Sequence, residues 1–351
     1  MSMIKNKKNR NMMLRKVYRI NKTGSIKNLI LIEENLKEPE SNEVCIEVKS
    51  IGLNFADLFA IWGLYSATPK ESFIPGLEFS GVVIKKGSNV KNYEVGDEII
   101  GLTRFGAYAT HVNVNENYIF KLPQNWNFVE GTSLLVNSLT AYYALKILAD
   151  IKDNKTVLIH SAAGGVGIYA NRIAKKFNAF TIGTIGSNSK IRTLKEEGYD
   201  RIIVRGKNFK QQLKTALGER SLDIVLESIG GKIFKDSFAL LSPEGRLVTF
   251  GSANFAMPGS KPNPIKLIYK YLTRPKIDPM KMINTNRAVM GFNLIWLWEK
   301  KKELQNYFVE IQKLNLAKPI VGKTFLFTEL HKAIQYLQSG KSVGKVVVKN
   351  F

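Results

Sequence analysis

A short glycine-rich segment between an apolar strand and a helix limits the possible folds of this chain more than any other feature. Residues 156–160 are Thr-Val-Leu-Ile-His, and residues 161–167 follow with an Ala-x-Gly-x-x-Gly pattern. Small residues in such a turn let the backbone approach a pyrophosphate, which the N-terminus of the next helix stabilises. A turn without a ligand is the alternative, and the flanking strand and helix argue against it. The segment therefore predicts a dinucleotide site formed by Ala163, Gly164, Gly165, Val166 and Gly167.

The region after residue 131 alternates short apolar strands with helices, which is typical of a parallel sheet covered by helices. The number of strands fits a doubly wound Rossmann sheet of α/β class. The six expected strands lie at 156–160, 180–184, 201–204, 222–227, 245–250 and 287–292.

The residues before this region instead show strand and turn signals. Val44, Ile46 and Val48 alternate with charged residues, and Pro-Gly and Val-Gly-Asp turns follow. This pattern predicts a partly open β-barrel, and the strand-helix-strand pattern of the C-terminus indicates that the chain returns to it. The expected organisation is a basic flexible tail (1–12), a barrel domain (13–134 and 315–351) and a nucleotide-binding domain (135–314) with an insertion at about 253–286.

The length and composition of the chain indicate its number of domains, its location and its binding partners. A chain of 351 residues exceeds one comfortable core, which favours two domains. One cysteine, Cys45, excludes an internal disulfide and favours a cytoplasmic location. The net charge of +23 could attract an anionic membrane or nucleic acid. The basic residues are scattered along the sequence, however, so a lysine-rich surface is the simpler interpretation of this charge. Binding of nucleic acid is therefore not expected.

The residues after the second expected strand indicate which nucleotide is preferred. NAD sites usually place an acidic residue there to bind the ribose 2′-hydroxyl. This chain has no acid in that stretch, and Ser187 and Lys190 are suited to a 2′-phosphate, with Arg205 as a second cation. The alternative for both cations is a solvated surface position. We therefore expect NADPH rather than NADH.

Several motifs in this order resemble the zinc-free quinone oxidoreductase branch of the medium-chain dehydrogenase/reductase superfamily. Within that branch, residues 291–298 and the long stretch before them look most like the vesicle amine transport protein homologues. The other motifs are Gly52-Leu53-Asn54-Phe55-Ala56-Asp57, Gly63-Leu64-Tyr65, Pro75-Gly76-Leu77-Glu78-Phe79-Ser80-Gly81, Val95-Gly96-Asp97, Leu139-Thr140-Ala141-Tyr142-Tyr143 and Gly344-Lys345-Val346-Val347. The resemblance implies a GroES-like barrel joined to a Rossmann domain, an active site between them, and a homodimer that pairs the sixth strands.

The resemblance also implies positions near the nicotinamide. Asn54 and Tyr65 are the expected catalytic residues, because either could donate a hydrogen bond to a substrate oxygen as it gains negative charge. The alternative for Asn54 is a structural role in a turn, and the alternative for Tyr65 is an aromatic side chain that only lines the cleft. Further cofactor contacts are expected at Thr140, Phe250, Gly251, Ser252, Phe292, Asn293 and Lys345.

A metal is not expected. Zinc at a catalytic site needs about three protein ligands. The histidines, His111, His160 and His331, lie in unrelated segments, and the cysteines of a structural zinc lobe are missing from the sequence. The sequence therefore predicts a zinc-independent, NADPH-dependent reductase of quinones or α,β-unsaturated carbonyls. The alternative is a nucleotide-binding scaffold or membrane-associated protein with little turnover.

The insertion at 253–286 leaves two interpretations open. Ile265, Ile268, Tyr269 and Leu272 fall on one helical face, and Lys266, Lys270 and Arg274 fall on the opposite one. Such a helix could cover the cleft as a lid, or it could make a weak contact with an anionic membrane. The general tendency of long insertions to serve an active site favours the lid.

Overall fold

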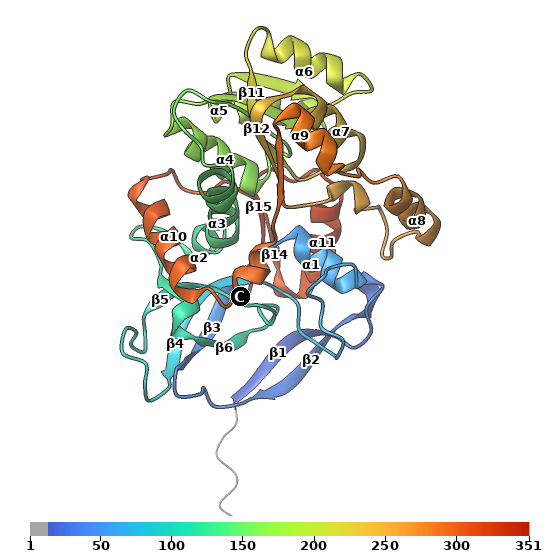
Figure 1. Cartoon of the computed structure of the whole chain (residues 1–351). Coiled ribbons are helices and arrows are strands. Elements are labelled where there is room, and N and C mark those ends of the chain that lie inside the picture. Colours follow the sequence, from blue (N-terminus) through green and yellow to red (C-terminus); the bar gives the residue numbers. More distant parts are fainter. Residues whose placement is uncertain (1–12, 351) are drawn as a thin grey trace, which may run out of the picture.

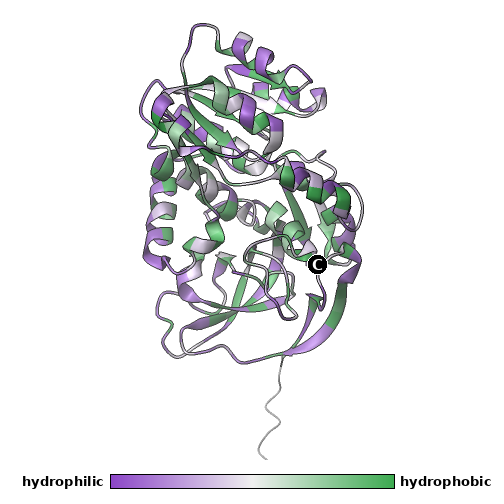
Figure 2. Ribbon diagram, turned by 45° about the vertical axis from the view of Figure 1, so that its right-hand side comes forward, coloured by the Kyte–Doolittle hydropathy of each residue, from purple (hydrophilic) through white to green (hydrophobic). Residues whose placement is uncertain are grey.

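Two β-sheets form the two halves of the molecule (Figure 1). A cleft is lined by residues of both halves. The computed structural model describes residues 13–350, so the expected tail lies outside the described residues. Figure 2 shows that hydrophobic residues concentrate on the interior strands, and hydrophilic ones on the outer faces of the helices. No helix in the described part of the chain combines the length and hydrophobicity that crossing a bilayer requires.

The upper half contains a six-stranded parallel sheet with the order β10-β9-β8-β11-β12-β13. In chain order this is 3-2-1-4-5-6, the Rossmann order, so the predicted fold class is confirmed. All six expected strands are present. β12 begins four residues earlier than expected, where Leu241 pairs with Leu222 before a register shift. The strands are β8 (Thr156–Ile159), β9 (Phe180–Ile185), β10 (Arg201–Val204), β11 (Leu222–Glu227), β12 (Leu241–Thr249) and β13 (Ala288–Gly291).

Helices cover both faces of this sheet because its strands are buried and rich in apolar residues. β8, for example, is buried along its whole length. The helices that contact its strands are α4 (Gly165–Lys175), α5 (Ile191–Glu196), α6 (Phe209–Leu217) and α7 (Gly231–Leu240). Outside them, α3 (Leu135–Tyr142) packs against α4, and α10 (Lys301–Lys313) packs against α3. β13 forms the outer edge of the sheet, and the homodimer expected through this edge stays a prediction.

The lower half contains a seven-stranded sheet of order β14-β15-β3-β4-β5-β7, with β6 beside β3. A two-stranded ribbon of β1 (Met13–Ile20) and β2 (Leu29–Leu36) lies next to it. Antiparallel pairing of β15 with β3 places residues 346–349 beside 50–53, so both ends of the chain build one sheet. The strands are β3 (Glu43–Leu53), β4 (Glu78–Lys86), β5 (Glu98–Leu102), β6 (His111–Asn115), β7 (Ile119–Lys121), β14 (Val321–Leu326) and β15 (Lys345–Lys349); α1 (Phe55–Trp62), α2 (Phe128–Gly131) and α11 (Leu330–Gln338) pack here.

The insertion between β12 and β13 crosses from the upper half to the lower one. It forms a short 3-10 turn, η5 (Ala253–Phe255), and two helices, α8 (Pro264–Leu272) and α9 (Pro279–Thr285). Asn263 caps α8 and Pro264 occupies its first turn, which explains where the helix begins. In Figure 1, α8 projects from the side of the molecule.

Candidate active site

A cleft with a volume of about 1510 Å³ lies between the two halves. This volume exceeds the usual range for a single small-molecule site. All the residues proposed from the sequence line it. They are Asn54, Tyr65, Thr140, Ala163, Gly164, Gly165, Val166, Gly167, Ser187, Lys190, Arg205, Phe250, Gly251, Ser252, Phe292, Asn293 and Lys345. The fold therefore brings together segments that are up to about 290 residues apart in the chain.

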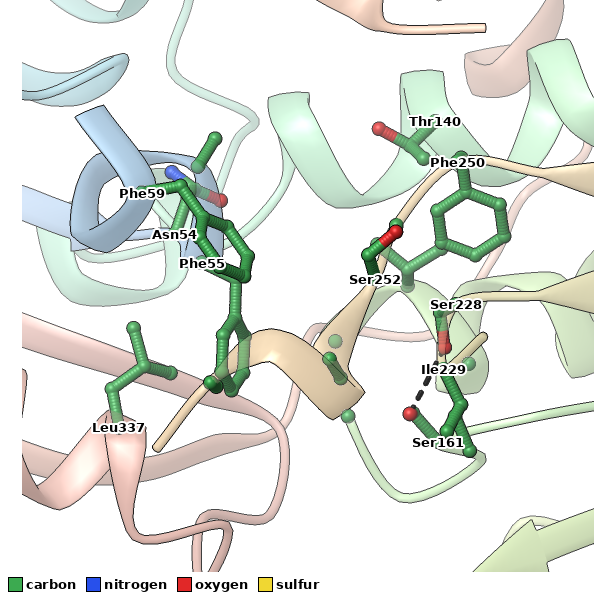
Figure 3. Close-up of a pocket in the computed structure, with 18 of the residues that line it drawn as sticks. Asn54, Phe55, Phe59, Thr140, Ser161, Ser228, Ile229, Phe250, Ser252 and Leu337 are labelled. Carbon is green, nitrogen blue, oxygen red and sulfur yellow. Dashed lines mark hydrogen bonds between the residues drawn. The ribbon is translucent and has the colours of Figure 1, made fainter. Parts of the chain in front are cut away.

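The glycine-rich turn has the geometry that a pyrophosphate requires. α4 begins at Gly165, and no described side chain caps its first N–H groups. A Cβ atom on Gly167 would lie 2.7 Å from the Cα atom of Ala162, so a glycine is needed for the helix to approach the strand. The Ser228 hydroxyl donates to the Ser161 hydroxyl at 3.0 Å beside this turn (Figure 3). Free N–H groups at a helix N-terminus form an anion site, and this one faces the cleft.

Two cations lie at the ends of β9 and β10, where the 2′-phosphate was expected. Lys190 Nζ donates to the carbonyl oxygens of Gly340 (2.6 Å) and Ser342 (2.7 Å), so it links the two halves of the molecule. Burial lowers the pKa of Lys190, and the positive charge of Arg205 lowers it further. Burial also lowers the pKa of Arg205 to about 10. A pair of partly buried cations with lowered pKa values is stabilised by an anion between them.

Arg205 is positioned by a chain of buried hydrogen bonds. Its guanidinium donates to the Thr184 hydroxyl at 2.8 Å, and Thr184 lies 2.8 Å from Nδ1 of His160. The Ser237 hydroxyl donates to a backbone carbonyl, so it accepts from Nε2 of His160. Nδ1 is then the acceptor, and burial lowers the pKa of His160 to about 3, which keeps the ring neutral. His160 is therefore a buried positioning residue beneath the nucleotide site.

The opposite end of the cleft contains an interdomain contact. The Tyr65 hydroxyl donates to Oδ1 of Asn293 at 2.6 Å. Burial raises the pKa of Tyr65, which keeps the hydroxyl protonated. Phe292 packs between Phe250 and Tyr143, with ring centroids 5.9 and 5.0 Å away, so one wall is aromatic.

Asn54 belongs to a buried polar network. Its Oδ1 accepts from Lys345 Nζ at 2.6 Å, and its amide nitrogen donates to Glu78 (3.1 Å) and to the Gly52 carbonyl (3.3 Å). Both amide hydrogens are thus engaged, which favours a positioning role for Asn54 over the expected hydrogen bond to substrate. Lys345 also forms an ion pair with Glu78, and both side chains are less than 5% exposed.

Asp57 lies beneath this network. It accepts from the Asn54 backbone N–H (2.8 Å) and from the Tyr108 hydroxyl (3.0 Å). Burial raises the pKa of Asp57 to about 7, although these hydrogen bonds and the charge of Lys345 oppose the shift. Asp57 therefore titrates close to neutral pH in the folded protein.

Asp57 should make stability depend on pH. The unfolded carboxyl has a pKa of about 3.9. Above that pH the unfolded state loses its proton while the folded state keeps it up to about pH 7, so stability falls as the pH rises through this window. Asp57→Asn should remove this loss, and denaturant unfolding at pH 5 and pH 8 measures it. The exposed Asp153→Asn is the control, and unchanged pH profiles in both variants would contradict the assignment.

Sequence reasoning missed Glu78, Asp57 and His160 as parts of the site. Glu78 had a local signal, since it is an acidic residue at the start of a strand whose first four residues are buried. A buried carboxylate needs a partner, and that requirement points to a cation elsewhere in the chain. Within residues 13–350, no group of three or more His, Cys, Asp or Glu side chains is placed to bind a metal ion.

The fold and the cleft define a two-domain oxidoreductase in which a barrel and a Rossmann sheet share one site. Comparisons with known proteins agree. Residues 40–124 match the alcohol dehydrogenase GroES-like domain, and residues 165–305 match the zinc-binding dehydrogenase model.

The chain is 32% identical over 313 residues to the zebrafish (Danio rerio) synaptic vesicle membrane protein VAT-1 homolog, covering 88% of this chain and 64% of that protein. The rat (Rattus norvegicus) counterpart is 31% identical, with 88% and 77% covered. The chain thus belongs to the medium-chain dehydrogenase/reductase superfamily, with the VAT-1 homologues as relatives.

Two solved structures are similar over nearly the whole chain. A mycobacterial protein complexed with NADPH has a TM-score of 0.83 and 25% identity, covering 96% of this chain and 100% of that one. The CurK enoyl reductase has a TM-score of 0.81 and 28% identity, covering 95% and 99%.

Proposed function

We propose that this protein is an NADPH-dependent reductase of α,β-unsaturated carbonyls or quinones that works without a metal ion. One observation carries the proposal. A single cleft contains the uncapped N-terminus of α4 and the Lys190–Arg205 pair, and the Tyr65–Asn293 contact lies at its other end. A nucleotide bound along the cleft would extend from the first feature to the second.

The residues of the nucleotide end fit NADPH. The first turn of α4 would bind the pyrophosphate, and Lys190 and Arg205 would bind the 2′-phosphate. Bound there, the reduced nicotinamide would supply a hydride to the β-carbon of an enone while the α-carbon accepts a proton from water, so that a C=C bond becomes a single bond and NADP⁺ is left. The mycobacterial NADPH complex and the enoyl reductase support this assignment.

The chain's own residues would orient the substrate. Tyr65 remains protonated because burial raises its pKa, so it acts as a hydrogen-bond donor rather than a base. Its hydroxyl would turn from Asn293 to the substrate oxygen as negative charge develops there. Phe250 and Phe292 would pack against a flat apolar substrate.

Lys190→Ala should weaken NADPH binding by roughly 10- to 100-fold, the contribution of one or two charge-assisted hydrogen bonds. NADH binding should change much less, because NADH lacks the 2′-phosphate. Titration of the purified protein with each nucleotide, followed by cofactor fluorescence, measures both affinities. Lys195→Ala is the control, since this lysine is exposed and lies outside the cleft lining. Equal losses of affinity for NADPH and NADH would show that Lys190 does not bind the 2′-phosphate.

Turnover separates the reductase from a nucleotide-binding scaffold. Oxidation of NADPH should accelerate with a panel of quinones and enones, and the reduced product should appear in equal amount. Tight NADPH binding without acceleration by any member of the panel would favour the scaffold.

A second candidate function is contact with an anionic membrane. Eight of the seventeen exposed large apolar side chains among the described residues lie between residues 265 and 283, and lysines flank them. The relatives are named vesicle membrane proteins. Co-sedimentation with phosphatidylserine vesicles at low salt tests this candidate, which fails if the protein stays in the supernatant.

A further inference from the structure

Part of the cleft is lined by apolar side chains from three helices. Phe55 and Phe59 come from α1, Leu337 from α11, and Leu267, Ile268 and Tyr271 from α8. Figure 3 shows Phe55, Phe59 and Leu337 on the side of the cleft away from Ser161, Ser228 and Ile229, which belong to the nucleotide end. We call this part, defined by the six side chains, the apolar channel.

The helical spacing of these residues explains how they form two walls. Phe55 and Phe59 are four residues apart on α1, and Leu267 and Tyr271 are four apart on α8, so each pair shares one face of its helix. Ile268 and Tyr271 are 61% and 58% exposed, and Phe55 and Phe59 are half-buried. A ligand between the walls would remove apolar surface from water, which is favourable.

Backbone contacts fix the start of the α8 segment on the lower half of the molecule. The Ser260 carbonyl accepts from the Ile26 N–H at 2.8 Å and from the Trp62 indole at 3.2 Å. The Gln338 amide donates to the Gly259 carbonyl at 2.9 Å, and Lys270 Nζ donates to the Asn254 carbonyl. The start of the insertion is thus fastened to the lower half, Lys270 ties α8 to η5 within the insertion, and α8 forms a wall of the channel.

We infer that the apolar channel binds an unbranched alkyl chain, so that the preferred substrate is an α,β-unsaturated carbonyl compound with a long chain. The inference rests on the proposed function and specifies its substrate class. The six channel side chains carry no charge, and they line the same cleft as Tyr65, which would bind the carbonyl oxygen. A compact enone would reach Tyr65 but leave the channel side chains in water.

A homologous series of 2-alkenals from four to twelve carbons tests the inference. The kcat/KM with NADPH should rise about two- to four-fold per methylene until the chain reaches α8. Leu267→Asp and Ile268→Asp place a charge in the channel, so their loss of kcat/KM should grow with chain length and reach at least about tenfold for the longest aldehyde. Ile265→Asp and Leu272→Asp are controls on the same helix, because both side chains are exposed and lie outside the cleft lining, and they should follow the wild-type series.

A second measurement does not need turnover. By calorimetry on the protein with NADP⁺, a saturated twelve-carbon methyl ketone should bind at least about tenfold more tightly than the four-carbon ketone. Leu267→Asp should abolish this difference, and Ile265→Asp should keep it. Equal affinity of the two ketones, or a flat kcat/KM series, overturns the inference while leaving the reductase intact. Ketone binding that depends on chain length, without reduction of any alkenal, instead overturns the proposed function and keeps the channel.

Discussion

Replacing Lys345 with methionine should lower the free energy of unfolding by about 3–5 kcal/mol at neutral pH. The substitution removes the cation of a buried ion pair and leaves the Glu78 carboxylate without a counter-charge. Glu78 would still accept hydrogen bonds from the Val136 N–H and from Asn54, but these do not supply a positive charge. Asn54 would also lose the donor to its Oδ1. Denaturant unfolding at pH 7 measures the change.

Two further variants separate the effect of the charge from that of the lysine stem. Lys313→Met removes an exposed partner of Glu310 and should cost less than about 0.5 kcal/mol. Lys345→Met combined with Glu78→Gln removes both charges and should recover roughly half or more of the loss. If the double variant is as unstable as the single one, packing of the lysine stem rather than its charge stabilises this part of the fold.

The fold was largely predictable because its signals are local. The strands of the parallel sheet contain short apolar runs, because helices bury both faces of the sheet. The presence of a helix in the insertion was equally predictable from the apolar spacing of residues 265–272. The early start of β12 was not, because it depends on pairing with Leu222 across a register shift.

The residues of the site were predictable where they belong to one continuous motif. Hydrogen-bond partners that come from distant segments of the chain were not predictable. The glycine turn is one such motif, and its residues line the cleft. The hydrogen bond from Lys190 to Gly340 joins residues 150 apart, and the one from Lys345 to Asn54 joins residues 291 apart. Neither spacing leaves a periodic signal. The sequence suggested Asn54 as a donor to substrate because side-chain chemistry alone does not show which hydrogens are already engaged.

Gly167→Ala should weaken the binding of both NADPH and NADH by roughly 1000-fold or more. The new Cβ would lie 2.7 Å from the Cα and carbonyl oxygen of Ala162 and from the carbonyl oxygen of Ser161. These are backbone atoms, so the strand-to-helix turn itself must shift. The overpacking is relieved when the turn shifts, and each charge-assisted hydrogen bond that this shift breaks between the first turn of α4 and a phosphate costs about 1.5–3 kcal/mol of binding free energy. Together these costs account for the weaker binding, since each 1.4 kcal/mol is about tenfold in affinity.

Gly186→Ala is the matched control in the same cleft. Its Cβ would meet the Arg205 guanidinium at 3.4 Å, an ordinary van der Waals contact with a side chain that can move. This variant should bind both nucleotides within a few-fold of the wild type, and fluorescence titration of the two variants gives the comparison. Circular dichroism and denaturant unfolding must show that Gly167→Ala is folded. A folded Gly167→Ala protein that binds NADPH as tightly as Gly186→Ala would mean that the nucleotide does not contact this turn, and the assignment of the cleft to NADPH would fail with it.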